Sequence, residues 1–125
     1  MKRYPYIFIV FIILHFAPGA TLAQQMLFRN YSVLDGLVSN TIWSVLQDDK
    51  GYMWFGTKNG ISRFDGYQFK AYQFNKKNPQ SLGNNFVFSI TEFDKKTLWV
   101  ATQGGVYIFD LERESFTKFA PLKDI

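Results

Sequence analysis

The sequence contains no cysteine, and its single histidine, His15, lies near the N-terminus. Without cysteine the chain forms no disulfide, no thiolate metal site and no cysteine nucleophile. A glycine-rich phosphate loop is also absent, because Gly56-Thr57-Lys58 lacks the spacing that such a loop requires. These absences argue against thiol enzymes, zinc proteins and nucleotide-binding enzymes, and we expect no cofactor and no metal.

The composition indicates a folded chain. Of the 125 residues, 47% are hydrophobic and 19% are aromatic, which is enough to build a core. The length permits one small domain at most.

The first 23 residues have the layout of a secretory signal peptide. A positive start, Met1-Lys2-Arg3, precedes an apolar run at residues 6–16, and small residues follow up to Ala23. The alternative is an uncleaved membrane anchor, but the run of eleven residues is shorter than the roughly 20 that span a bilayer. We expect cleavage after Ala23 and a periplasmic or secreted protein.

Cleavage changes the charge and the chemistry of the mature chain. Lys2, Arg3 and His15 leave with the signal peptide, so the net charge falls from +4 to +2 and no histidine remains. Serine-histidine catalysis and imidazole zinc sites are thereby excluded. The remaining Lys76-Lys77 and Lys95-Lys96 pairs stand among turn residues, and we expect no nucleic-acid partner.

The mature sequence repeats itself with a period of 45 residues. Ten identities share this register: Leu37/Leu82, Asn40/Asn85, Ser44/Ser89, Asp49/Asp94, Lys50/Lys95, Trp54/Trp99, Thr57/Thr102, Gly60/Gly105, Phe64/Phe109 and Asp65/Asp110. The first unit also contains Gly51, in the predicted turn before residue 52, and Gly56, in the predicted strand 52–57. Each unit predicts four short strands, at 41–47, 52–57, 61–64 and 67–72 and again at 86–93, 97–102, 106–110 and 115–119.

Four antiparallel strands in about 45 residues are typical of one β-propeller blade. We therefore predict an all-β fold with a strand of a closing blade at 24–36, blade 1 at 37–74, a linker at 75–85, blade 2 at 86–120 and the next connection at 121–125. A β-sandwich is the main alternative, but it gives no reason for a repeated Trp and Thr-x-x-Gly. Two blades make an incomplete ring, since closed propellers have about four to eight.

The first unit resembles a known family, the two-component regulator propeller repeat. The resemblance rests on DGLVSN at 35–40, QDDKGYMWFGT at 47–57 and GISRFDG at 60–66. It implies tandem blades in the periplasmic sensor region of hybrid two-component system histidine kinases, especially of Bacteroidetes, with polysaccharide breakdown products as common ligands. Membrane, kinase and regulator domains would follow such blades, so we expect this chain to be non-catalytic by itself.

Candidate ligand residues are those that break the repeat. Trp54 and Trp99 could stack on sugars, but their recurrence favours packing between blades. Trp43, matched by Phe88, and Tyr52, matched by Thr97, are better ligand candidates. The acids Asp48 and Asp49 are expected to cap a turn rather than to catalyse or bind calcium.

Three functions remain after the sequence is considered. The leading hypothesis is an exported ligand-sensing propeller segment, with further blades of a longer chain as partners and an oligosaccharide as ligand. The alternative is a carbohydrate-binding or scaffold module that completes a ring by homo-oligomerisation. A sialidase-like hydrolase is less well supported, because the mature arginines Arg29, Arg63 and Arg113 show no cluster.

Overall fold

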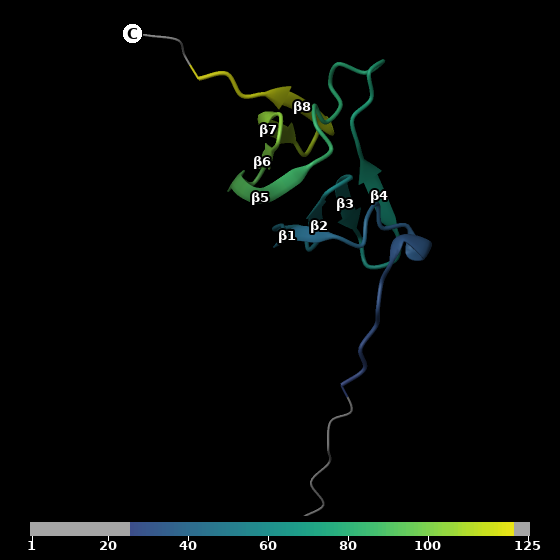
Figure 1. Cartoon of the computed structure of the whole chain (residues 1–125). Coiled ribbons are helices and arrows are strands. Elements are labelled where there is room, and N and C mark those ends of the chain that lie inside the picture. The colour runs from purple at the N-terminus through teal and green to yellow at the C-terminus, as the bar shows by residue number, and fades with distance from the viewer. Residues whose placement is uncertain (1–25, 122–125) are drawn as a thin grey trace, which may run out of the picture.

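Residues 26–121 are described by the structure, a computed structural model, and they form two four-stranded sheets (Figure 1). The first sheet contains β1 (Ile42–Gln47), β2 (Met53–Thr57), β3 (Gly60–Phe64) and β4 (Phe69–Tyr72). The second contains β5 (Val87–Asp94), β6 (Thr97–Thr102), β7 (Gly105–Asp110) and β8 (Ser115–Lys118). A short 3-10 helix, η1 (Val33–Asp35), precedes them.

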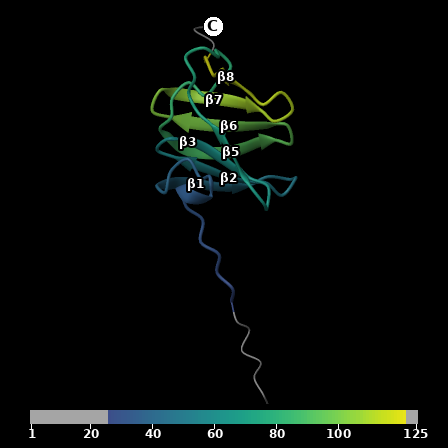
Figure 2. The same cartoon turned by 90° about the vertical axis from the view of Figure 1, so that its right-hand side faces the viewer.

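The two sheets have the topology of propeller blades. Their strands are antiparallel and follow the order β1-β2-β3-β4 and β5-β6-β7-β8. The first strands, β1 and β5, pack side by side, whereas β4 and β8 diverge (Figure 1). Turned by 90°, the strands of both sheets run across the view in a similar direction (Figure 2). The all-β prediction is confirmed, and each predicted strand lies within two residues of its observed bounds.

The predicted N-terminal strand at 24–36 is not found in its described part, residues 26–36. Residues 26–32 have no regular structure, and η1 follows. Its predicted partner is a strand of another blade, and none of the described strands takes that place. Tyr31 instead packs on Phe64 and Phe69 of blade 1, at ring distances of 4.8 and 5.5 Å.

The predicted signal peptide and its cleavage site lie outside the described residues. No helix among residues 26–121 is long and apolar enough to cross a membrane.

The Thr-x-x-Gly motif builds the same turn in both blades. The Thr57 hydroxyl donates to the Gly60 carbonyl at 2.8 Å, and Thr102 makes the same bond to Gly105 at 2.8 Å. Both glycines have a positive φ, 112° and 118°, which a side chain would disfavour. The repeated threonine and glycine are therefore structural.

The turn before β2 is held by Asp48 and not by Asp49, the residue that the repeat register singles out. Asp48 Oδ1 accepts from the backbone of Lys50 and Tyr52 at 2.9 and 3.0 Å, and its Oδ2 accepts from Trp54 Nε1 at 2.8 Å. Asp49 is exposed.

In blade 2 the equivalent turn bonds come from Asp94, which accepts from the backbone of Lys96 and the hydroxyl of Thr97. The longer β5, with a register irregularity between Glu92 and Asp94, shifts the turn by one residue relative to blade 1. Both blades thus hold this turn with an aspartate that accepts bonds from the residues after it, but the aspartate lies one repeat position later in blade 2.

The core lies between the blades. Its buried side chains come from both sheets and from the linker: Trp54, Ile61, Tyr72, Leu82, Val87, Ile90, Leu98, Val100, Tyr107, Phe109 and Phe116. Trp54 packs on Tyr72 and on Phe109 of blade 2, at 5.7 and 5.4 Å between rings. The sequence analysis favoured packing between blades for the repeated tryptophans, and Trp54 packs in this way.

At Gly56 the two sheets pack so closely that a side chain has no room. A Cβ at this position would lie 2.9 Å from Val87 Cγ1 and 3.4 Å from Ile90 Cγ1. Nearby, the Ile90 backbone amide donates across the interface to Ser44 Oγ at 3.0 Å. Glycine is required here because β5 occupies the space that a side chain would fill.

A charged cluster closes the opposite side of the interface. Glu114, in the turn between β7 and β8, accepts from Arg63 Nη1 at 2.8 Å and from the Tyr72 hydroxyl at 2.9 Å, and it pairs with Lys70. The bonds from Lys70, Tyr72 and Arg63 lower the pKa of Glu114, against a smaller opposing effect of burial. Burial, and then the bond to Glu114, raise the pKa of Tyr72. These four residues form an inter-blade clamp.

We predict that Gly56→Val lowers the free energy of unfolding by about 1–3 kcal/mol, because the added side chain collides with Val87. The matched control is Ala101→Val, which changes the equivalent position on the outward face of blade 2. At low protein concentration the control should stay within about 0.5 kcal/mol of wild type in urea unfolding. Equal losses for the two variants would contradict the assignment of Gly56 to a packed interface.

We predict that the clamp contributes stability that disappears in acid. The folded-state pKa of Glu114 lies below its ordinary value of 4.5, so its contribution is complete above that value and is lost as pH falls through the lowered pKa. Glu114→Gln should therefore cost about 0.5–1 kcal/mol at pH 7, and this cost should shrink progressively as the pH is lowered below 4.5. The control Glu112→Gln removes an exposed pair with Lys96 and should show a smaller loss at neutral pH. A pH-independent loss in Glu114→Gln would contradict the ionic role.

Candidate functional site

An aromatic cluster at the first strands of the two blades consists of Trp43 on β1, Phe88 on β5 and the partly exposed Phe86 just before β5. The Trp43 ring lies 5.9 Å from Phe86, and Phe86 lies 5.0 Å from Phe88. Trp43 leaves 56% of its surface exposed, and Phe88 is about half exposed. We call these three residues the aromatic platform. It joins β1 of one blade to β5 of the next.

The platform is exposed because the strands are bulged. On β1, Ile42 pairs with Thr57 and Ser44 pairs with Gly56, so Trp43 is the extra residue. On β5, Phe88 occupies the same place between Val87 and Ser89. A bulge redirects the side chain of its extra residue away from the regular alternation of the strand. Both blades thus turn an aromatic ring out of the packed interface.

A polar groove lies at the start of β1, and one of its lining residues, Thr41, is two positions from Trp43. Its volume is about 440 Å³, and it is lined by Val33, Val38, Ser39, Asn40, Thr41, Lys58 and Asn59. Thr41 lies two residues before Trp43, and its carbonyl accepts from the Lys58 backbone at 3.4 Å. The groove therefore offers hydroxyl, amide and ammonium groups at the end of β1 that carries Trp43. None of its lining residues is acidic.

Such an arrangement suits a ligand with one apolar face and many hydroxyl groups. An aromatic ring packs on the apolar face, while a few polar side chains fix the orientation. A pyranose sugar has both properties. Among residues 26–121 no group of three or more Asp, Glu, His or Cys could hold a metal ion.

The structure does not bring the two predicted ligand residues together. Trp43 lies near the Thr57 end of the β1–β2 pair, whereas Tyr52 precedes Met53 at the other end. The Tyr52 ring is covered by the Arg63 guanidinium at 4.8 Å and packs against the core. Tyr52 therefore belongs to the surroundings of the inter-blade clamp.

Trp54 and Trp99, which share one repeat position, have different surroundings. Trp54 is fully buried. Trp99 is partly exposed, and its ring packs on Phe93 and Phe119 at 5.4 and 5.1 Å. Phe93 occupies the repeat position of Asp48. The contact between the Phe93 and Trp99 rings in blade 2 therefore replaces the hydrogen bond from Trp54 to Asp48 in blade 1.

Sequence reasoning missed Phe86, Lys58 and Asn59. Phe86 is the first residue of the strand predicted at 86–93 and corresponds to Thr41, so the repeat gave no aromatic signal for it. Lys58 and Asn59 read as ordinary turn residues. The packing of β1 beside β5 places Phe86 next to Trp43, and the bond from Lys58 to Thr41 places Lys58 beside the start of β1.

Comparison with known proteins identifies the repeat. Residues 36–59 match the family described as two component regulator propeller. Histidine kinase P4 of Formosa agariphila is 32% identical over 59 residues, which are 47% of this chain and 4% of that protein. The crystal structure of the extracellular domain of the hybrid two component system BT3049 from B. thetaiotaomicron is also similar. It has a TM-score of 0.68 and 28% identity, over 73% of this chain and 13% of that one.

These matches agree with the two sheets and with the resemblance seen in the sequence. The chain spans only a small part of the length of either relative. Its residues 36–59 match the two component regulator propeller repeat, and its two blades are similar to part of the extracellular domain of a hybrid two component system.

Proposed function

We propose that the chain is an exported, non-catalytic sensor segment that binds an oligosaccharide on the aromatic platform. The observation that carries the proposal is the pair of bulges that expose Trp43 and Phe88 beside a polar groove. Export through a signal peptide cleaved after Ala23, into the periplasm or the medium, is part of the same proposal. The similarity to an extracellular sensor domain supports this location.

The non-catalytic role is supported by how the carboxylates are used. Asp65 accepts from the backbone of Tyr67 and Gln68, and Asp110 accepts from Glu112 and Arg113. These bonds to backbone amides lower the pKa of both carboxyl groups. A carboxylate held ionised in a turn is poorly suited to act as a general acid. In this proposal the chain recognises a ligand, and signalling chemistry belongs to other parts of a longer sensor.

The positive charge of the groove favours neutral or anionic ligands. Lys58 contributes one cation, and the lining residues include no carboxylate that would repel an anion. The groove therefore accepts neutral sugars and is better suited to sugars that carry a carboxylate or sulfate group.

We predict that at least one oligosaccharide from a set of neutral, uronic-acid and sulfated probes binds the exported chain. Trp43→Ala should weaken that binding about tenfold, because an aromatic contact contributes about 0.5–1.5 kcal/mol beyond its buried area. Isothermal titration calorimetry measures the change. Trp43→Phe should retain most of the affinity.

The matched control is Phe74→Ala. Phe74 is 53% exposed, close to the value for Trp43, but it lies in the segment after β4 and belongs neither to the platform nor to the lining of the groove. Its removal should leave binding unchanged. Equal losses in Phe74→Ala and Trp43→Ala, or binding by none of the probes, would contradict the proposed site.

A further inference from the structure

The segment that links the two blades covers a small pocket on blade 2. The pocket has a volume of about 250 Å³, and its lining comes from the segment 74–83, from β7 and from β8. Tyr107 on β7 and Phe116 and Lys118 on β8 supply the side of blade 2. We call this cavity the linker pocket. It shares no lining residue with the polar groove near Trp43.

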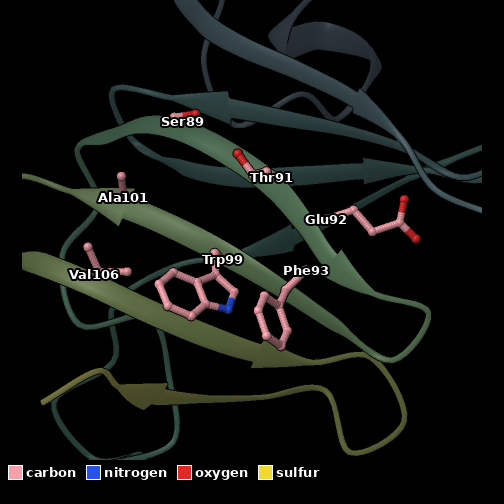
Figure 3. A pocket seen from close by; sticks show the side chains of 7 residues that line it. All are labelled: Ser89, Thr91, Glu92, Phe93, Trp99, Ala101 and Val106. Atoms are coloured by element: carbon pink, nitrogen blue, oxygen red, sulfur yellow. The ribbon is translucent and has the colours of Figure 1, made fainter. Parts of the chain in front are cut away.

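The linker pocket lies on the face of blade 2 that is turned toward blade 1. Val100 pairs with Tyr107, and Tyr107 pairs with Lys118, so these three side chains share one face of the sheet. Val100 is buried in the core between the blades. Trp99 and Val106 lie on the opposite face, where they line a shallow apolar groove (Figure 3). The linker pocket is therefore built without any residue of that opposite face.

Blade 2 departs from the repeat at three positions that line the pocket. The replacements, given with their blade 1 equivalents, are Gly83 for Val38, Tyr107 for Ser62 and Lys118 for Ala71. In blade 1 the Val38 amide donates to Ser62 Oγ at 3.0 Å, and Ser62 is fully buried. In blade 2 a Cβ on Gly83 would overlap the Tyr107 hydroxyl. The small residue thus makes room for the larger, polar side chain.

The Tyr107 hydroxyl is a polar group that can receive a ligand. Tyr107 is only 9% exposed. Within residues 26–121 its hydroxyl makes no hydrogen bond, and no fully buried side-chain polar atom in that range lacks a partner. The hydroxyl oxygen is therefore open to the pocket that Tyr107 lines. Buried tyrosines usually find a hydrogen-bond partner for this group, and here a ligand atom would supply it.

Two lysines make the linker pocket positive. Lys76 and Lys118 both line it, and no Asp or Glu does. In the part of the chain that the structure describes, the ion pairs involve other residues and leave both of these ammonium groups uncompensated. Ammonium groups donate hydrogen bonds and accept none, so the pocket favours a ligand that carries an anionic acceptor.

The linker wall is held in place by its own hydrogen bonds. Ser81 Oγ accepts from the Asn75 amide at 2.9 Å, and Asn78 Oδ1 accepts from the Gln80 amide at 3.0 Å. The Phe116 amide donates to the Gln80 carbonyl at 2.8 Å and so ties the linker to β8. The pocket is therefore formed before a ligand arrives, which lowers the entropic cost of binding.

We propose that the linker pocket binds a small organic anion. The acidic group accepts from Lys76, Lys118 and the Tyr107 hydroxyl. The apolar part of the ligand packs on Phe116 and Pro79. A volume of about 250 Å³ is below the range of pockets that hold drug-sized molecules, so the ligand has one ring or a short carbon chain.

This inference is independent of the proposed sugar site. Phe74 lines the linker pocket, but an oligosaccharide is too large for that pocket. Phe74→Ala therefore still serves as the control for oligosaccharide binding at the aromatic platform. A failure of sugar binding at Trp43 would leave the linker pocket untouched.

Three probes separate charge from shape. Benzoate carries a carboxylate on one apolar ring, benzamide has the same shape without the charge, and inorganic phosphate has the charge without the ring. Each is titrated into the full, isotope-labelled chain, and the backbone amides are followed by NMR. We predict that benzoate binds with a dissociation constant on the order of 1–10 mM, as so small a ligand allows. Its shifts should fall in the segment 74–83, β7 and β8, and the other two probes should bind at least about fivefold more weakly.

Two variants test the assigned groups. Tyr107→Phe removes a hydroxyl that has no partner in the described residues, so urea unfolding should be unchanged while benzoate binding weakens about threefold to tenfold. Lys118→Gln should weaken binding by a similar factor. The matched control is Lys77→Gln, which makes the same charge change next to Lys76 at a residue that does not line the pocket, and it should bind benzoate as wild type does.

Several results would overturn the proposal. They are absence of benzoate binding at about 20 mM, equal affinity for benzoate and either other probe, and shifts that fall outside the stated segments. Wild-type affinity in both Tyr107→Phe and Lys118→Gln, or a loss in Lys77→Gln as large as theirs, would overturn it equally.

Discussion

Gly56 lets β5 approach β2 closely enough for Val87 to pack directly against the sheet of blade 1. The other contacts between the blades depend on this close packing. The Ile90–Ser44 bond fixes the position of β5 along β1. Trp54 fills space between the two sheets by packing on Phe109, and the inter-blade clamp of Glu114 with Arg63, Lys70 and Tyr72 joins the blades further from Gly56. Because the core lies between sheets, each blade depends on its neighbour for burial.

This dependence explains the different positions of the two repeated tryptophans. Trp54 is covered by blade 2 and bonds to Asp48, whereas the ring of Trp99 packs on Phe93 and Phe119 of its own blade and stays partly exposed. The same residue type is core on one blade and surface on the next. The bulged residues Trp43 and Phe88 behave alike on both blades, since their exposure results from local backbone geometry and not from the neighbour. Within one repeat, the tryptophan position therefore serves packing between blades, and the bulge position exposes an aromatic ring to solvent.

The strands were predictable because the 45-residue register and the turn residues act locally. Thr57 with Gly60 and Thr102 with Gly105 end β2 and β6 wherever the blade is placed. The long-range features were not predictable. Glu114 contacts residues more than 40 positions away, and the strand predicted at 24–36 depended on a partner outside the described residues. The one-residue shift that makes Asp48 the counterpart of Asp94 arises from the irregularity in β5, which composition does not reveal.

The central claim is that the two blades form one cooperative unit through the contact at Gly56. Native-state hydrogen exchange, followed by NMR at the Ile90 amide, tests it directly, because that amide donates across the interface to Ser44. The account predicts an exchange free energy equal to that of the central amides in β2 and β6, as expected when exchange requires global unfolding. Exchange of Ile90 at a much lower free energy, while β2 and β6 remain protected, would show that the blades separate as independent units and would contradict the account.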